Sequence, residues 1–270
     1  MPTIPQLALL LVAIVLFAVG GGMSIARAWG ERPALRLAAV ACLVAGIVSS
    51  AIVLVWHGAT RGGWIPIGDN FDALIWLATL LALFILYIQR HRRLGVLDWF
   101  VMPIVILLLG AAIIFGRTSE RGYHDVVRNA WWWVHTFSAW GGSLALAIAA
   151  ASGAMYVYVS RRLRSKSPIG PQFGSLERME QVTMLAVTLG FALLTVGMIT
   201  GGVQMFAEGK HTPMAKVILA VGVWVVYAIV LHAPINPSFR GRKVAVLSVV
   251  GFVLLLGVLL TVLLVPMGAS

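Results

Sequence analysis

The chain has 270 residues, of which 60% are hydrophobic and only 11% are charged, and its mean hydropathy is +0.97. This composition excludes an ordinary soluble domain, which is roughly 45–50% apolar, and it indicates a polytopic membrane protein. The net charge of +11 does not indicate a nucleic-acid partner, because Lys and Arg lie in short clusters between long apolar runs. A single cysteine, Cys42, excludes an intrachain disulfide and a Cys-based metal site.

Eight apolar runs are long enough, at about 20 residues each, to cross a membrane as helices. In chain order they cover about 7–26, 35–56, 70–89, 96–116, 131–159, 181–205, 215–233 and 244–266. The first run meets its first positive charge, Arg27, only at its end, which is the reverse of a secretory signal peptide. We therefore predict an all-α, polytopic integral membrane protein with about eight transmembrane helices, the first of which is retained.

The loops between these runs alternate in charge. Lys and Arg are concentrated in the loops that include residues 27–36, 90–93, 161–178 and 240–243. The positive-inside rule makes these loops cytoplasmic, which predicts a multi-pass protein of the cell inner membrane with both termini on the outer, periplasmic side. An even number of helices agrees with termini on one side.

No loop is long enough to form a separate folded domain, so we expect a single transmembrane helical domain over residues 1–270. The segment SKSPIGPQFG, residues 165–174, is rich in Pro, Ser and Gly. We expect it to be a flexible cytoplasmic connection, and we predict that it divides the first five helices from the last three.

The fifth run begins with three consecutive indoles, Trp131, Trp132 and Trp133. Because tryptophan is enriched at membrane–water interfaces, the simplest interpretation of these residues is an aromatic belt. His135 follows about one turn deeper, where an ionisable group is costly and is often functional.

The helical face of His135 also carries small residues, namely Ser138, Ala139 and Gly142. Such a strip has two uses. It lets a neighbouring helix approach closely, or it leaves room for a flat ligand whose metal the imidazole holds.

His232 lies near the end of the seventh run, in VWVVYAIVLHAP, with Trp224 and Ala228 on the same helical face. The simplest interpretation of His232 is an interfacial histidine that is hydrogen-bonded to a carbonyl or to water, since Pro234 marks the helix end. His135 and His232 are predicted at opposite depths. If both bind iron, we expect two separate sites.

The other histidines fall in predicted loops: His57, His124 and His211 on the outer side and His91 on the inner side. Each is expected to be a solvated loop residue. The segment RGGWIPIGDNFDALIWLA leads into the third run, with Asp69 or Asn70 suited to the N-cap and Asp72 in the first turn.

In the sixth run, Gly190, Gly197 and Gly201 form one smooth face, which favours close helix packing. No hydrolytic or nucleotide-binding motif is visible anywhere in the chain.

Several segments together resemble the cytochrome c assembly membrane proteins of the CcsA and CcmC type, with their YpjD-like and HemX-like relatives. IPIGDNFDALIWL is similar to that family's P-x-S-N-x-Y-E-S-L helix start, and WWWVHTFSAW to its tryptophan-then-histidine helix. TVGMITGGV is similar to the family's T-L-G-x-x-x-G-A-x helix. The run from Trp224 to His232, followed by RGRKVA, resembles its W-x-x-Y-A-x-Y-L-H segment and the turn after it. The likeness spans about residues 62–265 in matching order.

The resemblance implies a haem-handling protein of cytochrome c biogenesis, an assembly factor or haem carrier rather than a hydrolytic or redox enzyme. It implies His135 and His232 as ligands of the haem iron, the first on the outer side and the second within the membrane. The implied cofactor-binding residues add the indoles Trp131, Trp132, Trp133 and Trp224. The implied partners are haem, apocytochrome c and other cytochrome c biogenesis proteins of the lipid bilayer.

The chain departs from the family pattern in two places. VQMFAEGKHTPMAK replaces the tryptophan-rich outer loop and contains no tryptophan, and LLVPMGAS has no counterpart of the G-L-H-S-Y histidine. These features are most similar to the YpjD-like and HemX-like branch, and His211 or His124 would supply a second outer ligand.

Two alternatives remain open. One is a membrane partner or regulatory protein that keeps the scaffold without ligating haem. The other is a small-solute transporter, which is less favoured because only Asp98, Glu180 and the histidines offer polar groups near membrane depth.

Overall fold

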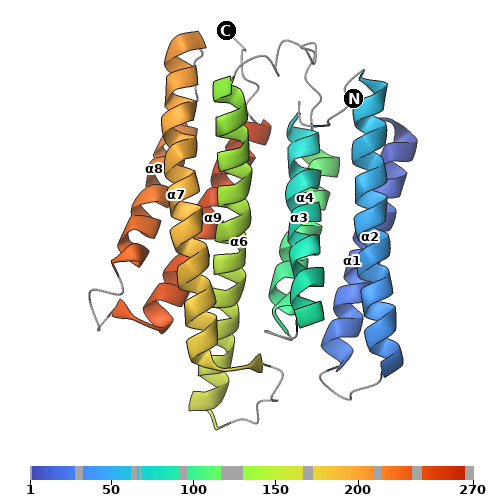
Figure 1. Cartoon of the computed structure of the whole chain (residues 1–270), viewed down its shortest axis with the longest axis vertical. Helices are drawn as coiled ribbons and strands as arrows, with labels where there is room; N and C mark the ends of the chain where they lie inside the picture. Colours follow the sequence, from blue (N-terminus) through green and yellow to red (C-terminus); the bar gives the residue numbers. More distant parts are fainter. Residues whose placement is uncertain are drawn as a thin grey trace. The chain divides into compact units, whose positions relative to one another are not determined.

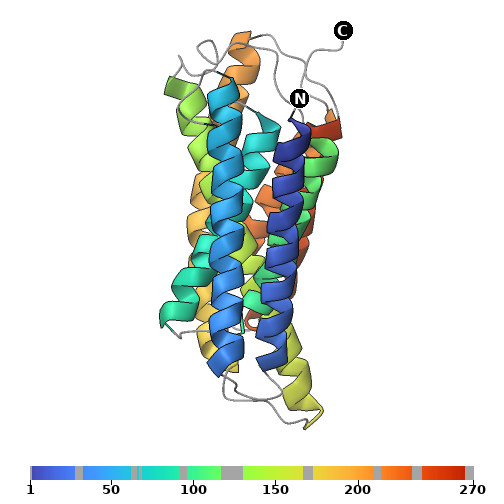
Figure 2. The same ribbon diagram turned by 90° about the vertical axis from the view of Figure 1, so that its right-hand side faces the viewer.

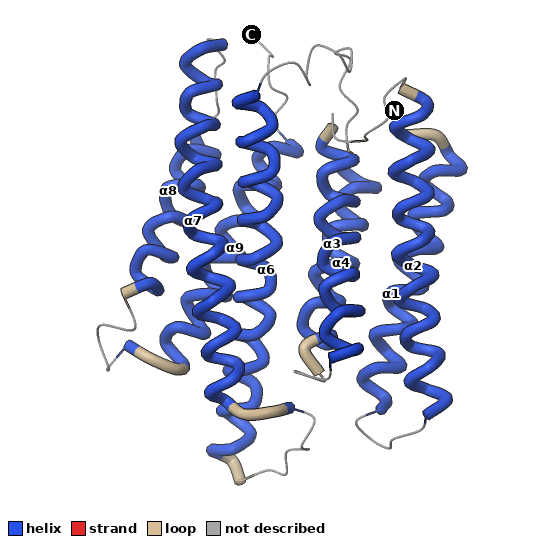
Figure 3. The backbone as a smooth tube through the Cα atoms, viewed as in Figure 1, coloured by secondary structure: helices blue, strands red, loops and turns tan. Residues whose placement is uncertain are grey.

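Helix is the only regular secondary structure in the residues that the computed structural model describes, which are 2–27, 33–61, 66, 69–91, 96–116, 130–166, 173–208, 214–232 and 239–264 (Figure 3). Within these ranges, eight helices are long and apolar enough to cross a membrane. They are α1 (Ile4–Ala26), α2 (Pro33–Thr60), α3 (Asn70–His91), α4 (Asp98–Phe115), α6 (Ala130–Arg164), α7 (Leu176–Glu208), α8 (Met214–Leu231) and α9 (Arg242–Leu264). The predicted all-α, multi-pass fold is confirmed, and each helix lies close to its predicted bounds.

The chain divides into two compact units, and the first comprises Met1–Val126 with Gly170–Gly174. In this unit α1 packs against α2 and α4, and α3 packs against the same two helices. Figure 2 shows α1 and α2 side by side at the blue end of the chain. The core takes a large buried side chain from each helix, namely Phe17, Leu43, Phe71 and Leu108.

The second unit comprises Val127–Ile169 and Ser175–Ser270. Here α6 packs against α7 and α9, and α8 packs against the same two helices; Figure 1 shows the long helices α6 and α7 side by side. Tyr227 of α8 is fully buried in this unit, and its hydroxyl donates a hydrogen bond to the Ser248 carbonyl oxygen of α9 at 3.0 Å.

The division into units corrects one expectation. The sequence predicts that residues 165–174 separate the first five helices from the last three, yet the fifth helix, α6, packs directly against the sixth, α7. The units divide one helix earlier, between Val126 and Val127. The physical reason is that α6 and α7 present small residues to one another, and these let two backbones approach closely.

The predicted glycine face of α7 lies against α6, which confirms its role in close packing. A Cβ built at Gly197 would lie 3.6 Å from the Ala139 nitrogen, and one at Gly190 would lie 2.6 Å from Leu146 Cδ2. On the other helix, a Cβ at Gly142 would lie 3.3 Å from the Leu194 nitrogen. Glycine therefore keeps the two helices at their observed separation.

A contact between α6 and α9 gives a direct test of this packing. A Cβ at Gly153 would lie 2.7 Å from the Ala245 carbonyl oxygen, so Gly153→Ala must push α6 and α9 apart. We expect the free energy of unfolding to fall by about 1–3 kcal/mol, measured as a lower Tm in detergent. The control is Gly222→Ala, because a Cβ there meets nothing within 4 Å. An equal Tm for both variants would contradict the close contact.

Candidate functional site

His135 lies in the second turn of α6, and its ring faces α7. The ring nitrogen Nδ1 lies 2.9 Å from the Gly197 carbonyl oxygen and 3.4 Å from the Thr200 hydroxyl. Because a carbonyl oxygen can only accept a hydrogen bond, Nδ1 carries the proton, and the neutral ring has its lone pair at Nε2. Among the residues that the structure describes, none is hydrogen-bonded to Nε2.

Gly201 of α7 makes this ring position possible, because a Cβ there would lie 2.9 Å from Cε1 of His135 and 3.2 Å from its Nδ1. The strip of small residues beside the histidine is covered by the same helix. Ser138 and Ala139 face Gly197. The strip therefore serves close helix packing, the first of its two expected uses, and a ligand of His135 would reach Nε2 from outside this helix contact.

The three tryptophans form the start of an aromatic row along α6. Trp131 is 51% exposed, and the ring centroid of Trp132 lies 5.3 Å from that of Trp133 in an edge-to-face contact. Trp133 stacks on Phe137 at 5.4 Å. Trp131 and Trp132 precede His135 by four and three residues, so they lie on its side of the helix, about one turn toward the start.

No ring contact joins these indoles to the His135 ring in the described part of α6. They flank the histidine along the helix axis rather than stacking on it.

His232 directly follows α8 and is exposed. Its Nδ1 lies 2.8 Å from the Ala228 carbonyl oxygen, so here too Nδ1 donates and the neutral ring has its lone pair at Nε2. Trp224 lies two turns earlier and faces α7. Its Nε1 donates to the Thr195 hydroxyl at 3.1 Å, and its ring centroid lies 5.3 Å from that of Phe191.

The structure does not bring the two histidines together. Trp224 of α8 bonds to Thr195 of α7, and His135 contacts Gly197 and Thr200, which lie further along α7 toward its end. His232 lies eight residues after Trp224, about 12 Å at the helical rise of 1.5 Å per residue, in the direction away from that end of α7. Any ligands of His135 and His232 would therefore occupy separate sites.

In the segment that replaces the family's tryptophan-rich loop, the residues that the structure describes, 203–208 and 214–216, are helical. α7 continues to Glu208, and α8 begins at Met214. Phe206, the aromatic residue of this segment, is 82% exposed on α7. The candidate second ligands His124 and His211 lie outside the described residues.

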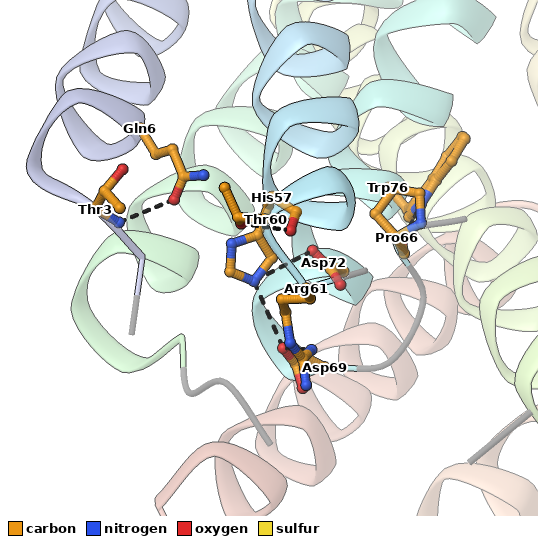
Figure 4. A network of polar contacts seen from close by, with 9 residues as sticks. All are labelled: Thr3, Gln6, His57, Thr60, Arg61, Pro66, Asp69, Asp72 and Trp76. Carbon is orange, nitrogen blue, oxygen red and sulfur yellow. Dashed lines mark hydrogen bonds and ion pairs between the residues drawn. The ribbon is translucent and has the colours of Figure 1, made fainter. Parts of the chain in front are cut away.

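A further polar cluster lies in the first unit, where α2 ends and α3 begins (Figure 4). His57 is only 2% exposed, and its Nε2 lies 3.5 Å from Asp69 Oδ2 and 3.9 Å from Asp72 Oδ1. Both carboxyl groups are buried, and Arg61 donates to Asp69 Oδ2. The expectation that His57 is a solvated loop residue is therefore wrong, because α2 continues to Thr60 and its last turn directs His57 inward.

The sequence analysis did not predict this cluster, although the sequence contains a pattern that indicates it. The sequence places a titratable residue at the predicted end of one helix and two more at the predicted start of the next. A helical hairpin brings such ends side by side. Asp72 does lie in the first turn of α3, as predicted. Trp76 Nε1 donates a hydrogen bond to the Pro66 carbonyl oxygen at 2.7 Å, and this bond holds Pro66 against α3.

Asp98 and Glu180, the acidic residues behind the transporter alternative, both have bonding partners. Asp98 accepts hydrogen bonds from Ser24 and, at 2.9 Å, from Gln89, and its carboxylate lies 3.4 Å from Arg27. These contacts join α1, α3 and α4. Glu180 accepts a hydrogen bond from the Gly241 backbone nitrogen at 3.2 Å. Each carboxylate thus has a role in holding helices together.

A sequence model of the family described as cytochrome C assembly protein matches residues 65–269, which is most of the chain. The chain belongs to this family. The match covers both His135 and His232, and the predicted family resemblance is confirmed. The finer assignment to the YpjD-like and HemX-like branch stays a prediction.

Individual relatives agree with the cytochrome C assembly match. The chain is 25% identical over 237 residues to the cytochrome c biogenesis protein CcsA of Prochlorococcus marinus (strain NATL2A), covering 76% of this chain and 74% of the relative. It is 22% identical over 261 residues to the CcsA of Prochlorococcus marinus (strain MIT 9301), covering 87% and 83%. With the CcsA of Microcystis aeruginosa (strain NIES-843 / IAM M-2473) it shares 25% identity over 244 residues, covering 72% and 74%.

The orientation of Trp224 can be tested through its bond to Thr195. Trp224→Phe removes the N–H donor and keeps an aromatic ring beside Phe191, so we expect a loss of about 0.5–1.5 kcal/mol in the free energy of unfolding. Thr195→Val removes the acceptor of the same bond. The two losses, measured from thermal unfolding in detergent, should be less than additive in the double variant. Full additivity would show that the two side chains do not interact.

Proposed function

We propose that this chain handles haem in cytochrome c biogenesis and that His135 would hold the haem iron through Nε2. Membership of the cytochrome C assembly family supports the role. The hydrogen bond from Nδ1 to the Gly197 carbonyl oxygen, at 2.9 Å, is the observation that carries the residue assignment. Histidines that ligate metals almost always donate their other ring N–H to a carboxylate or a carbonyl.

The residues around His135 fit this assignment. The Gly197 carbonyl fixes the tautomer and the plane of the ring, and Gly201 leaves the space that the ring occupies. When bound, haem supplies an iron centre that accepts an imidazole nitrogen. Trp131 and Trp132, on the same side of α6, offer aromatic faces for contact with a flat apolar ring.

His232 is proposed as the ligand of a second, separate haem site toward the other end of α8. Its Nδ1 donates to the Ala228 carbonyl, the same arrangement that orients His135, and Trp224 packs two turns away. The proposed partners are apocytochrome c and other cytochrome c biogenesis proteins. The proposed location is the cell inner membrane, with both chain termini and His135 toward the outer side.

A second candidate function is a membrane partner protein that keeps the family scaffold without ligating haem. Two observations favour it. The small-residue strip beside His135 packs against α7, and the exposed Phe206, on the last turns of α7, lies in the segment where the family has tryptophans.

Absorption spectra of the detergent-purified protein, oxidised and reduced, separate the two functions. The protein is prepared from cells with ample haem, and haem is also added back in vitro. Haem ligation predicts a stoichiometric Soret band that His135→Ala diminishes and that the double variant with His232→Ala abolishes. A flat spectrum after add-back would favour the partner function, and an unchanged band in His135→Ala would reject His135 as a ligand.

Two adjacent glycines test whether the placement of the ring matters for haem. Gly201→Leu puts a side chain where the His135 ring lies, so we expect haem occupancy to fall several-fold, measured as Soret absorbance per protein. Gly202→Leu is the matched control, because a Cβ at Gly202 meets nothing within 4 Å, and its occupancy should equal that of the parent. Equal occupancy in both variants would contradict the proposed site.

A further inference from the structure

We propose that His57, Asp69 and Asp72 bind a divalent first-row transition-metal ion of the Zn²⁺ class. Each residue offers one ligand atom, and these three atoms all lie within 4.8 Å of one another. They come from the last turn of α2 and from the start of α3, and Figure 4 shows His57 directed toward both carboxylates. This site lies in the first unit and is independent of the haem proposal.

The separations fit ligands of a shared cation better than they fit hydrogen bonds. An N–H···O hydrogen bond spans about 2.7–3.2 Å, whereas Nε2 of His57 lies 3.5 Å from Asp69 Oδ2 and 3.9 Å from Asp72 Oδ1. Zinc binds imidazole nitrogen and carboxylate oxygen at about 2.0–2.2 Å. Two ligands at that distance, at angles from tetrahedral upward, lie about 3.4 to 4 Å apart.

The environment of His57 also indicates that its imidazole binds a ligand. Both ring nitrogens of His57 are buried without a hydrogen-bond partner, and the residue is 2% exposed. A buried polar atom without a partner destabilises the fold, and a metal at Nε2 would offset this cost for that nitrogen. The ring of Phe71, with its centroid 5.0 Å from that of His57, packs against the imidazole and limits its rotation.

The local charge also favours a cation. Asp69 and Asp72 bring two negative charges into a buried region, and Arg61 offsets one of them through Asp69 Oδ2. A divalent ion neutralises both carboxylates, so it competes with Arg61 for Asp69. The Arg61 side chain is 21% exposed and follows the last residue of α2, which gives it a path to solvent when a metal binds.

The donor set selects the class of metal. Ca²⁺ and Mg²⁺ take oxygen ligands, which would leave the imidazole without a role. One imidazole with two carboxylates suits Zn²⁺ and its first-row neighbours. Such an ion would join the end of α2 to the start of α3.

The test uses the full chain in detergent, prepared without haem and stripped of metal with a chelator. Zn²⁺ is added back and counted by elemental analysis after removal of excess, and Co²⁺ serves as the spectroscopic probe. We expect one Zn²⁺ per chain and a visible Co²⁺ ligand-field band. His57→Gln and the isosteric Asp72→Asn should both lose the ion, whereas Arg61→Gln should bind it more tightly because it removes the competing cation.

The controls separate this site from the haem site. His135→Ala and His232→Ala should keep the Co²⁺ band, and His57→Gln should keep the haem Soret band. Less than stoichiometric Zn²⁺ in the parent chain would overturn the proposal. A Co²⁺ band unchanged in both His57→Gln and Asp72→Asn would overturn it as well, and Asp72→Asn remains decisive if His57→Gln does not fold.

Discussion

The close approach of α6 and α7 is the constraint on which the histidine chemistry of the second unit depends. Glycines on both helices let the two backbones come together, and the approach brings the Gly197 carbonyl oxygen to 2.9 Å from Nδ1 of His135. That one bond sets the tautomer, so the same packing that stabilises the unit also leaves the lone pair of the neutral ring on Nε2. The glycine at position 201 matters for the same reason, because any larger residue would occupy the place of the ring.

In the first unit the buried histidine lies beside side-chain carboxylates, whereas His135 in the second unit lies beside a backbone carbonyl. His57 meets two carboxylates, one of which is paired with Arg61, so the imidazole is surrounded by charge in a place with little water. The cytochrome C assembly match begins at residue 65. It therefore contains Asp69 and Asp72 but not His57, and the cluster joins a residue that precedes the match to two that lie within it.

Much of the fold could be predicted from the sequence because membrane helices depend on the length of apolar runs, a local property. The glycine face of α7 was equally accessible, since it depends only on helical spacing. The burial of His57 could not be predicted in this way, because α2 extends to Thr60, a few residues beyond the predicted end. This one added turn places His57 in a buried part of the helix instead of in a loop. The partnership of α6 with α7 was also missed, since a linker rich in Pro, Ser and Gly suggested a division that helix packing overrode.

The most direct test of His135 as a haem ligand is rescue of His135→Gly by free imidazole. When haem is added to the His135→Gly protein, with His232 replaced by Ala to leave a single site, we expect no Soret band of ligated haem. Added imidazole should restore it, because the small base can occupy the space left by the ring and bind iron in its place. An intact Soret band in that variant before imidazole is added would contradict the claim that His135 holds the iron.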